Sequence, residues 1–364
     1  MTDLSRSTIE AALNEYREPY LEQSLVSAGA VRDVTIDAGS VTLAIRLGFP
    51  LGAHAETIRT EVKSRIRSLP GVSAVAVEVD WRVVSHAVQR NLRPVGDIRN
   101  IIAVASGKGG VGKSTTAVNL ALALAADGAR VGILDADIYG PSQPRMLGLS
   151  GQRPASPDGK SLEPLIAYDL RCMSIGFLID EEQPMVWRGP MVTQALTQLI
   201  NDTNWGELDY LFVDMPPGTG DIQLTLSQRV PVSGAVIVTT PQDIALLDAR
   251  KGLKMFEKVE VAVLGVVENM STYVCPECGH EAHVFGEGGG SRMAQQYDVP
   301  FLGSLPLDTR IQQETDAGRP SVVADPEGSP ARAYRDIARR TAARLAASGK
   351  DYSHHFPKIS IEET

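Results

Sequence analysis

Cysteine is scarce in this chain of 364 residues, which contains three: Cys172, Cys275 and Cys278. So few thiols cannot form the disulfide framework of a small secreted protein. No run of about 18 consecutive apolar residues is present, so the sequence predicts no membrane-spanning helix. The acidic, amphipathic N-terminal segment has neither the apolar core nor the cleavage site of a secretion signal. We therefore expect a cytoplasmic protein.

An excess of basic residues is also lacking. Lysine and arginine together number 35 against 44 acidic residues, which gives a formal net charge of -9. This balance argues against general binding of nucleic acid or of an anionic membrane, so we expect neither as a partner. The sequence contains no internal repeat and no low-complexity tract, and its length allows two domains, one of them large.

The first 81 residues have the pattern of a small α+β domain. Apolar residues at helical spacing predict helices at 7–16 and 55–69. Strands are predicted at 31–37, 41–47 and 72–79, the first two joined by a hairpin turn. This module is within the size range of autonomous domains.

The rest of the chain has a different rhythm. Polar and basic residues at 82–99 predict a linker, and the polar tail at 351–364 is not an amphipathic membrane anchor. Between them, residues 100–350 alternate apolar runs with helical stretches. Strands buried on both faces and alternating with helices predict an α/β domain with a mostly parallel sheet flanked by helices. The apolar runs lie at 100–106, 130–137, 208–216, 234–241 and 261–270.

A phosphate-binding loop is predicted by GKGGVGKST at 107–115, which lies between a predicted strand and a helix that begins at Lys113. Backbone N–H groups and the helix dipole would bind a phosphate, Lys113 would neutralise its oxygens, and Ser114 would ligate Mg²⁺. The alternative, a glycine-rich turn that binds nothing, does not explain this context. We expect a P-loop NTPase that binds ATP and Mg²⁺ through Gly107, Lys108, Gly109, Gly110, Val111, Gly112, Lys113, Ser114 and Thr115.

A second chemical centre is predicted at CPECGH, where the spacing of Cys275 and Cys278 can direct two thiolates at one metal. His280 and His283 follow, but four ligands from nine consecutive residues would strain the backbone. One chain therefore offers two thiolates, and a two-fold dimer would supply two more. Four thiolates suit a [4Fe–4S] cluster or a zinc ion, and the sequence leaves both open.

The phosphate loop resembles the deviant Walker A sequence of the ParA/MinD/nitrogenase-iron-protein class of dimeric ATPases. The resemblance implies that Lys108 reaches across the dimer interface and acts in catalysis beside Lys113, like an arginine finger given in trans. It further implies that Asp137, in DADIYGPS, positions the attacking water and that Asn269 recognises the adenine amino group. The segment YLFVDMPPGTGD resembles a Walker B strand, whose Asp214 would hold Mg²⁺ through water.

Taken in order, the deviant Walker A loop, DADIYGPSQPRMLG, WRGPM, DMPPGTGD and CPECGH resemble the Mrp/ApbC family of iron–sulfur cluster carrier ATPases. The resemblance implies a homodimer that binds a labile [4Fe–4S] cluster between Cys275 and Cys278 of both chains and passes it to apo-proteins. Residues 1–81 resemble the MIP18-type domain. They lack the cysteine that this domain commonly carries after its second strand, so we expect a docking or structural role for them.

Two other functions are weighed. A ParA/MinD-like positioning ATPase would bind membrane or DNA, which the acidic composition opposes, and it would leave the C-x-x-C pair unexplained. A dimeric targeting ATPase could hold structural zinc at the same thiols. The third cysteine, Cys172, lies in an apolar context and is expected to be a small core residue.

Overall fold

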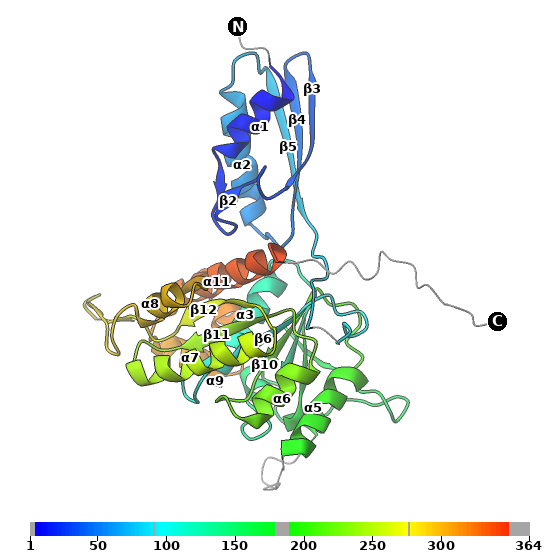
Figure 1. The fold of residues 1–364 in the computed structure, drawn as a ribbon, viewed down its shortest axis with the longest axis vertical. Helices are drawn as coiled ribbons and strands as arrows, with labels where there is room; N and C mark the ends of the chain where they lie inside the picture. The colour runs from blue at the N-terminus through cyan, green and yellow to red at the C-terminus, as the bar shows by residue number, and fades with distance from the viewer. Residues whose placement is uncertain (1–3, 90–91, 179–188, 276, 349–364) are drawn as a thin grey trace, which may run out of the picture.

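The computed structural model describes residues 4–89, 92–178, 189–275 and 277–348. It consists of a small N-terminal module and a larger α/β domain (Figure 1). The tail predicted at 351–364 and the first two residues of the WRGPM motif lie outside the described residues. Within the part of the chain that is described, no helix is both long and apolar enough to cross a membrane.

The N-terminal module folds around one three-stranded sheet with the order β3-β4-β5. β3 pairs antiparallel with β4 through the predicted hairpin, and β4 pairs parallel with β5 after the crossover helix α2. Alternate side chains of β4 are buried, as the period of two in the sequence predicts. The elements are α1 (Arg6–Asn14), β1 (Arg17–Glu18), β2 (Gln23–Ser24), β3 (Val31–Asp37), β4 (Ser40–Leu47), α2 (His54–Arg67) and β5 (Ala74–Trp81).

The larger domain is built on an eight-stranded sheet with the order β15-β12-β11-β6-β10-β7-β9-β8. All neighbouring pairs are parallel except β8 with β9. The five predicted apolar runs form its five adjacent inner strands, which confirms the mostly parallel sheet. The outer three were not predicted. The strands are β6 (Ile101–Ala105), β7 (Val131–Asp135), β8 (Leu165–Ala167), β9 (Leu170–Ser174), β10 (Tyr210–Asp214), β11 (Gly234–Thr239), β12 (Val263–Glu268) and β15 (Phe301–Ser304).

Helices cover this sheet, and the two strands of a separate small hairpin follow β12. β11 and β12 lie between α11 and α7 in Figure 1. The remaining elements are α3 (Lys113–Ala126), α4 (Gln143–Met146), η1 (Ile175–Phe177), α5 (Gly189–Asp202), α6 (Asp221–Arg229), α7 (Asp243–Lys258), β13 (Tyr273–Val274), β14 (Glu281–Ala282), α8 (Gly289–Gln296), α9 (Thr309–Asp316), α10 (Ser321–Ala324) and α11 (Ser329–Ala346).

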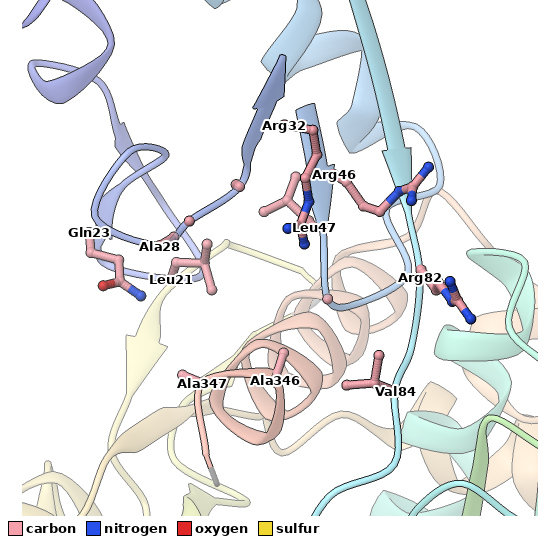
Figure 2. A pocket seen from close by; sticks show the side chains of 13 residues that line it. Leu21, Gln23, Ala28, Arg32, Arg46, Leu47, Arg82, Val84, Ala346 and Ala347 are labelled. Atoms are coloured by element: carbon pink, nitrogen blue, oxygen red, sulfur yellow. The ribbon is translucent and has the colours of Figure 1, made fainter. Parts of the chain in front are cut away.

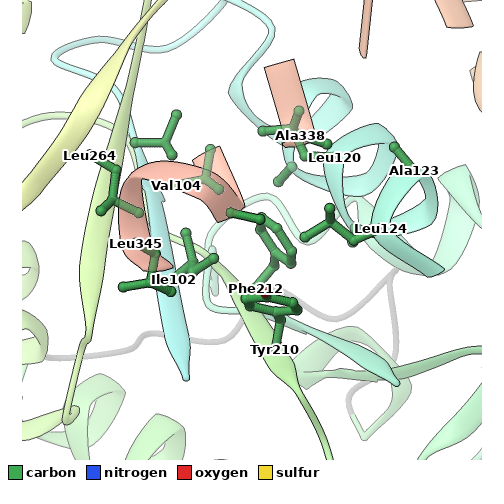
Figure 3. Packing of buried hydrophobic residues seen from close by; sticks show 14 of the residues in the cluster. Ile102, Val104, Leu120, Ala123, Leu124, Tyr210, Phe212, Leu264, Ala338 and Leu345 are labelled. Atoms are coloured by element: carbon green, nitrogen blue, oxygen red, sulfur yellow. The ribbon is translucent and has the colours of Figure 1, made fainter. Parts of the chain in front are cut away.

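The core of the larger domain lies between the central strands and the helix pair α3 and α11. Figure 3 shows Tyr210 and Phe212 of β10 packed with Leu120 and Leu124 of α3 and with Leu345 of α11. All five are at most 1 % exposed, and each such large side chain stabilises the fold by roughly 2 kcal/mol. This packing fixes α3, the helix that begins at the phosphate loop, against the centre of the sheet.

The two domains meet through a polar contact centred on Tyr20. Its hydroxyl donates to the Asp336 carboxylate of α11 at 2.8 Å. The Arg339 guanidinium lies over the Tyr20 ring, 5.7 Å from its centroid, and donates to its hydroxyl at 3.3 Å. Arg339 also donates two hydrogen bonds to Asp127, at 2.6 and 2.9 Å. Because Asp127 is the C-cap residue of α3, this contact joins the module to the far end of the phosphate-loop helix.

Candidate nucleotide and thiol sites

The phosphate loop leaves the carboxyl end of β6 and leads directly into α3. A Cβ atom at Gly107 would lie 2.1 Å from the backbone of Asp248 in α7. One at Gly112 would lie 2.1 Å from Asn269 Nδ2. Gly112 also has a φ of 82°, in the left-handed region that glycine adopts without strain. The loop therefore requires glycine at these two positions, and its backbone N–H groups stay open to a ligand.

The predicted phosphate and magnesium residues are close together behind this loop. Lys113 is 6 % exposed, and its ammonium group donates to the Asp214 carboxylate, which is fully buried. Lys113 Nζ also contacts Ser114 Oγ at 3.0 Å. The second oxygen of Asp214 accepts a hydrogen bond from Gln143 Nε2 at 2.9 Å. The sequence did not single out Gln143, which the structure places between Asp214 and the backbone carbonyl of Ser114.

The two aspartates that end β7 have different surroundings. Asp135 is fully buried and accepts backbone hydrogen bonds from Asp137, Ser142 and Gln143. Burial, followed by the negative charge of Asp214, raises the pKa of Asp135 to about 7. Asp137 is only partly buried, and burial raises its pKa against the opposing effect of the Lys113 charge. Asp135 therefore holds the turn after β7, and Asp137 is the one that retains access to solvent.

Lys108 lies half-buried at the start of the loop, and its backbone carbonyl accepts a hydrogen bond from Ser106 Oγ at 2.9 Å. Among the described residues its side chain has no ion-pair partner. The segment after β10 packs against the same loop, because the Gly218 N–H donates to the Ser106 carbonyl at 3.0 Å. Gly109 and Gly110 are exposed between these contacts. Lys108 thus lies next to the exposed glycines of the loop.

A pocket of about 240 Å³ lies beside the phosphate loop. Asn269 lines this pocket, and its Nδ2 donates a hydrogen bond of 2.9 Å to the backbone carbonyl of the buried Val111. Gly112 and Thr115 form the edge of the pocket at the phosphate loop. The position of the pocket therefore suits the base and ribose of a nucleotide whose phosphates bind to that loop. The sequence predicted Asn269 here but not the segment 306–316, which forms another wall and carries no local motif. Its lining includes Met146, Met270, Leu307, Asp308, Gln312 and Tyr334.

The C-x-x-C pair lies on the small hairpin formed by β13 and β14. The Cys275 N–H donates to the His280 carbonyl at 2.9 Å, and the Gly279 N–H donates to the Cys275 carbonyl at 2.9 Å. These bonds close a tight turn that brings the two thiols into contact. Cys275 is half-buried and Cys278 is exposed. The turn therefore presents both sulfur atoms on the surface of the domain.

The electrostatics of the turn favour a thiolate. The backbone N–H groups of Cys278 and Glu277, followed by the Cys278 thiol, lower the pKa of Cys275. His283 is turned elsewhere, with Nδ1 hydrogen-bonded to the Ser271 carbonyl at 3.0 Å. In the described ranges, no group of three or more His, Cys, Asp or Glu side chains is arranged to hold a metal ion. The His283 ring is thus hydrogen-bonded to the backbone before β13.

Both ends of the segment that carries the thiols are fixed to the sheet. Asn269 at its start contacts the phosphate loop. Near the other end of the segment, the Gly290 N–H at the start of α8 donates a hydrogen bond of 2.5 Å to the Glu268 carboxylate. Glu268 is 1 % exposed. The sequence analysis missed Glu268 because a single glutamate at the end of a strand carries no signal of its own.

Cys172 is separate from these sites. It lies in β9, is fully buried, and burial raises the pKa of its thiol well above the usual value. The prediction of a small core residue is confirmed.

Comparison with known proteins gives the family. Residues 97–342 match the model of the NUBPL iron-transfer P-loop NTPases, and residues 6–79 match that of an iron–sulfur cluster assembly protein domain. The chain is 46% identical to the iron–sulfur cluster carrier protein of Salmonella typhimurium, over 96% of this chain and 94% of that one. It is 54% identical to the iron–sulfur cluster transfer protein NUBPL of Mus musculus, over 70% of this chain and 81% of that one.

Solved structures agree with these relatives. A nucleotide-binding protein of Archaeoglobus fulgidus, in complex with ADP, is 41% identical, with a TM-score of 0.56 and coverage of 64% of this chain and 90% of that one. The cell division ATPase MinD of Pyrococcus furiosus, 22% identical over 66% of this chain and 97% of its own, has the same fold with a TM-score of 0.52. The chain is thus a P-loop ATPase, and it belongs to the NUBPL iron-transfer P-loop NTPase family.

Proposed function

We propose that this protein is a homodimeric, cytoplasmic ATPase that carries a labile [4Fe–4S] cluster and transfers it to apo iron–sulfur proteins. The observation that carries the proposal is the exposed pair of thiols, Cys275 and Cys278, on a domain with a P-loop nucleotide site. Relatives that match nearly the whole chain are named iron–sulfur cluster carrier proteins, which supports the same function.

Two thiols are too few for a complete cluster site, since a [4Fe–4S] cluster takes four thiolates. The described residues offer no third ligand beside Cys275 and Cys278. A second copy of the chain, related by a two-fold axis, would supply the same two sulfur atoms again. A cluster held by two exposed turns can be released more readily than one enclosed by a single chain.

Exposed apolar side chains support a dimer contact on this face. Ile244 and Leu247, one helical turn apart on α7, are 69% and 52% exposed. Val274 and Val284, beside the thiol pair, are also exposed. The chain that follows Val284 lies close to the start of α7, because a Cβ at Gly286 would lie 3.7 Å from Pro241 Cβ. Apolar groups gathered beside a functional site are typical of a protein interface.

The nucleotide chemistry follows from the residues behind the phosphate loop. When ATP binds, Lys113 would move its hydrogen bonds from Asp214 to the phosphate oxygens, and Ser114 and Asp214 would then hold Mg²⁺, directly and through water respectively. The ion stabilises the charge that develops on the phosphates. Asp137 would orient the attacking water, Asn269 would contact adenine, and Lys108 of the other chain would complete the site.

Nucleotide and cluster sites are connected by a short segment. Asn269 contacts the phosphate loop through Val111, and Cys275 follows it by six residues. A change at the nucleotide pocket can therefore shift the thiol turn. We infer that ATP turnover alters the contact between the two cluster-binding turns.

The test replaces both thiols, Cys275→Ala with Cys278→Ala, and reconstitutes the protein with iron and sulfide under anaerobic conditions. The brown absorption of the cluster should be lost, while ADP binding measured by calorimetry should stay unchanged, because the thiol turn does not contact the phosphates. Cys172→Ala is the matched control and should keep the chromophore.

The proposal fails if the double variant reconstitutes an unchanged cluster. It also fails if the anaerobically purified protein is colourless and contains stoichiometric zinc, the result expected of a targeting ATPase with a structural metal. Sedimentation with anionic liposomes or DNA in the presence of ATP would instead support a positioning ATPase.

A further inference from the structure

A cleft of about 610 Å³ lies where the N-terminal module meets the end of α11. Figure 2 shows Arg32, from the module, directed toward the end of α11 at Ala346, with Arg46 and Arg82 extending to one side. Clefts of this size at domain boundaries are the usual sites of small-molecule ligands. Neither the nucleotide site nor the thiol pair contributes to it.

The charge around the cleft is strongly positive. Arg46 forms an ion pair with Asp80, with hydrogen bonds of 2.6 and 2.9 Å. Arg32 and Arg82 have no ion-pair partner among the described residues. Three guanidinium groups thus line the cleft, one of them paired with a carboxylate, in a chain whose net charge is -9. The charge of these side chains is therefore opposite in sign to the net charge of the protein.

Apart from Gln23, the side chains that line the cleft between these arginines are apolar. Leu21 and Leu47 come from the module, Val84 from the segment after β5, and Ala346 and Ala347 from α11. A ligand that was only an ion would leave these walls in contact with water. A ligand with an apolar body would cover them, and each buried methylene would add about 0.8 kcal/mol.

The walls are also fixed relative to each other. A Cβ atom at Gly48 would lie 2.9 Å from Ala346 Cβ, so the module and α11 are in close contact at the edge of the cleft. The contact of Tyr20 with Arg339 joins the same two elements. The cleft is therefore formed before any ligand arrives, which lowers the cost of binding.

We propose that this cleft binds a small organic anion, in which a carboxylate or a phosphate monoester is joined to a compact apolar group. The planar guanidinium fork of arginine matches both anions with paired hydrogen bonds. Arg32 and Arg82 supply the free charge, and the apolar group lies against Leu47, Val84 and α11. The site depends on neither cluster binding nor ATP hydrolysis, so it goes beyond the proposed function.

The test measures the binding of four probes to the full chain by calorimetry: 3-phenylpropionate, phenyl phosphate, 3-phenylpropanamide and inorganic phosphate. Saturating ADP and Mg²⁺ are present so that the phosphate loop is occupied. One or both phenyl anions should bind, and the more tightly bound of them identifies the anion class. The neutral amide and inorganic phosphate should bind at least about tenfold more weakly.

Two variants locate the site. Arg32→Gln with Arg82→Gln should weaken binding of the phenyl anions at least about tenfold. The matched control, Lys63→Gln with Arg67→Gln, removes the same charge from exposed positions of α2 and should bind as the unaltered protein does. Ala347→Trp keeps every arginine but fills the cleft from the α11 side, so it should also abolish binding.

The proposal is overturned if neither phenyl anion binds, or if the arginine variant and Ala347→Trp both bind as tightly as the unaltered protein. Equal affinity for inorganic phosphate, or for the amide, would likewise overturn it, because the site would then recognise a bare ion or only an apolar group. Loss of cluster reconstitution in the Cys275 and Cys278 variant changes none of these outcomes.

Discussion

The buried ammonium group of Lys113 donates a hydrogen bond to the buried carboxylate of Asp214. In the proposed function these two groups bind the phosphates of ATP and the hydrated Mg²⁺. Nucleotide binding would then exchange this ion pair for a lysine–phosphate contact and a carboxylate that is free for the metal shell. The pair thus keeps a buried lysine compensated until the ligand arrives.

Asp214→Asn should lower both stability and activity. Without nucleotide, the buried Lys113 loses its compensating charge, and the free energy of unfolding should fall by about 3 kcal/mol. Mg²⁺-dependent hydrolysis should fall about 100-fold, because the carboxylate that would hold Mg²⁺ through water is lost. Thermal unfolding and phosphate release measure the two effects. Glu78→Gln, at an exposed position of β5, is the control. Unchanged stability of the Asn variant would show that the ion pair is not formed in solution.

Lys108 gives a prediction that tests catalysis in trans. Lys108→Ala and Lys113→Ala should each abolish hydrolysis, the first by removing the charge given to the partner and the second by removing nucleotide binding. In an equal mixture, half of the dimers contain one chain of each kind. The nucleotide held by the Lys108→Ala chain then receives Lys108 from its partner, so about one quarter of the unaltered activity should return. A mixture as inactive as its components would place Lys108 outside catalysis in trans.

The lowered pKa of Cys275 should be measurable by alkylation of its thiol. In a Cys172→Ala background, Cys275 of the metal-free protein should react with iodoacetamide at a lower pH than it does in the urea-unfolded chain. The reason is that the backbone N–H groups lower its pKa and the thiolate is the nucleophile. The pH profile of labelling, read by mass spectrometry of the peptide, measures the shift. Cys278→Ala should move the profile upward by removing one donor. Identical profiles for the folded and unfolded chains would contradict the turn geometry.

The sequence predicted those parts of the molecule whose pattern lies within a few consecutive residues. The five inner strands are nearly continuous apolar runs, and the loop 107–115 has its chemistry in nine consecutive residues. The outer strands β8, β9 and β15 are short and lack such a run, so they were missed. Within the segment 82–99, predicted as a linker, His86 and Gln89 contact the α/β domain: His86 contacts Asn100, and Gln89 donates to the Ser227 carbonyl.

What the sequence could not predict depends on residues that are far apart along the chain. The wall of the nucleoside pocket at 306–316 meets Asn269 and Thr115 only in the folded protein. The arginines of the cleft come from three different segments, and none of them stands out by its neighbours in the sequence. Tyr20 and Arg339 are more than 300 positions apart, yet they form the central contact between the domains.

The contact between the domains should be measurable as an energetic coupling. Glu18, which is fully buried, accepts hydrogen bonds from the Tyr20 N–H and from His54, and so fixes Tyr20 toward Arg339. Tyr20→Phe removes only a hydroxyl, and we expect a loss of about 1 kcal/mol in the free energy of unfolding. Arg339→Met should cost about 3 to 5 kcal/mol, because the Asp127 carboxylate is then left buried without its partner.

Combining Arg339→Met with Asp127→Asn removes both charges and should recover part of that loss. The free energies of unfolding of the two single variants and the double variant would then not be additive, and urea unfolding of all three measures the difference. Arg332→Met, at an exposed position of the same helix, is the control and should change stability by less than about 0.5 kcal/mol. If the two single losses simply added, Arg339 and Asp127 would not be coupled, and the module would be joined to the α3 cap by some other contact. If instead the pair is coupled, Tyr20→Phe should reduce that coupling, because its hydroxyl holds the guanidinium in position.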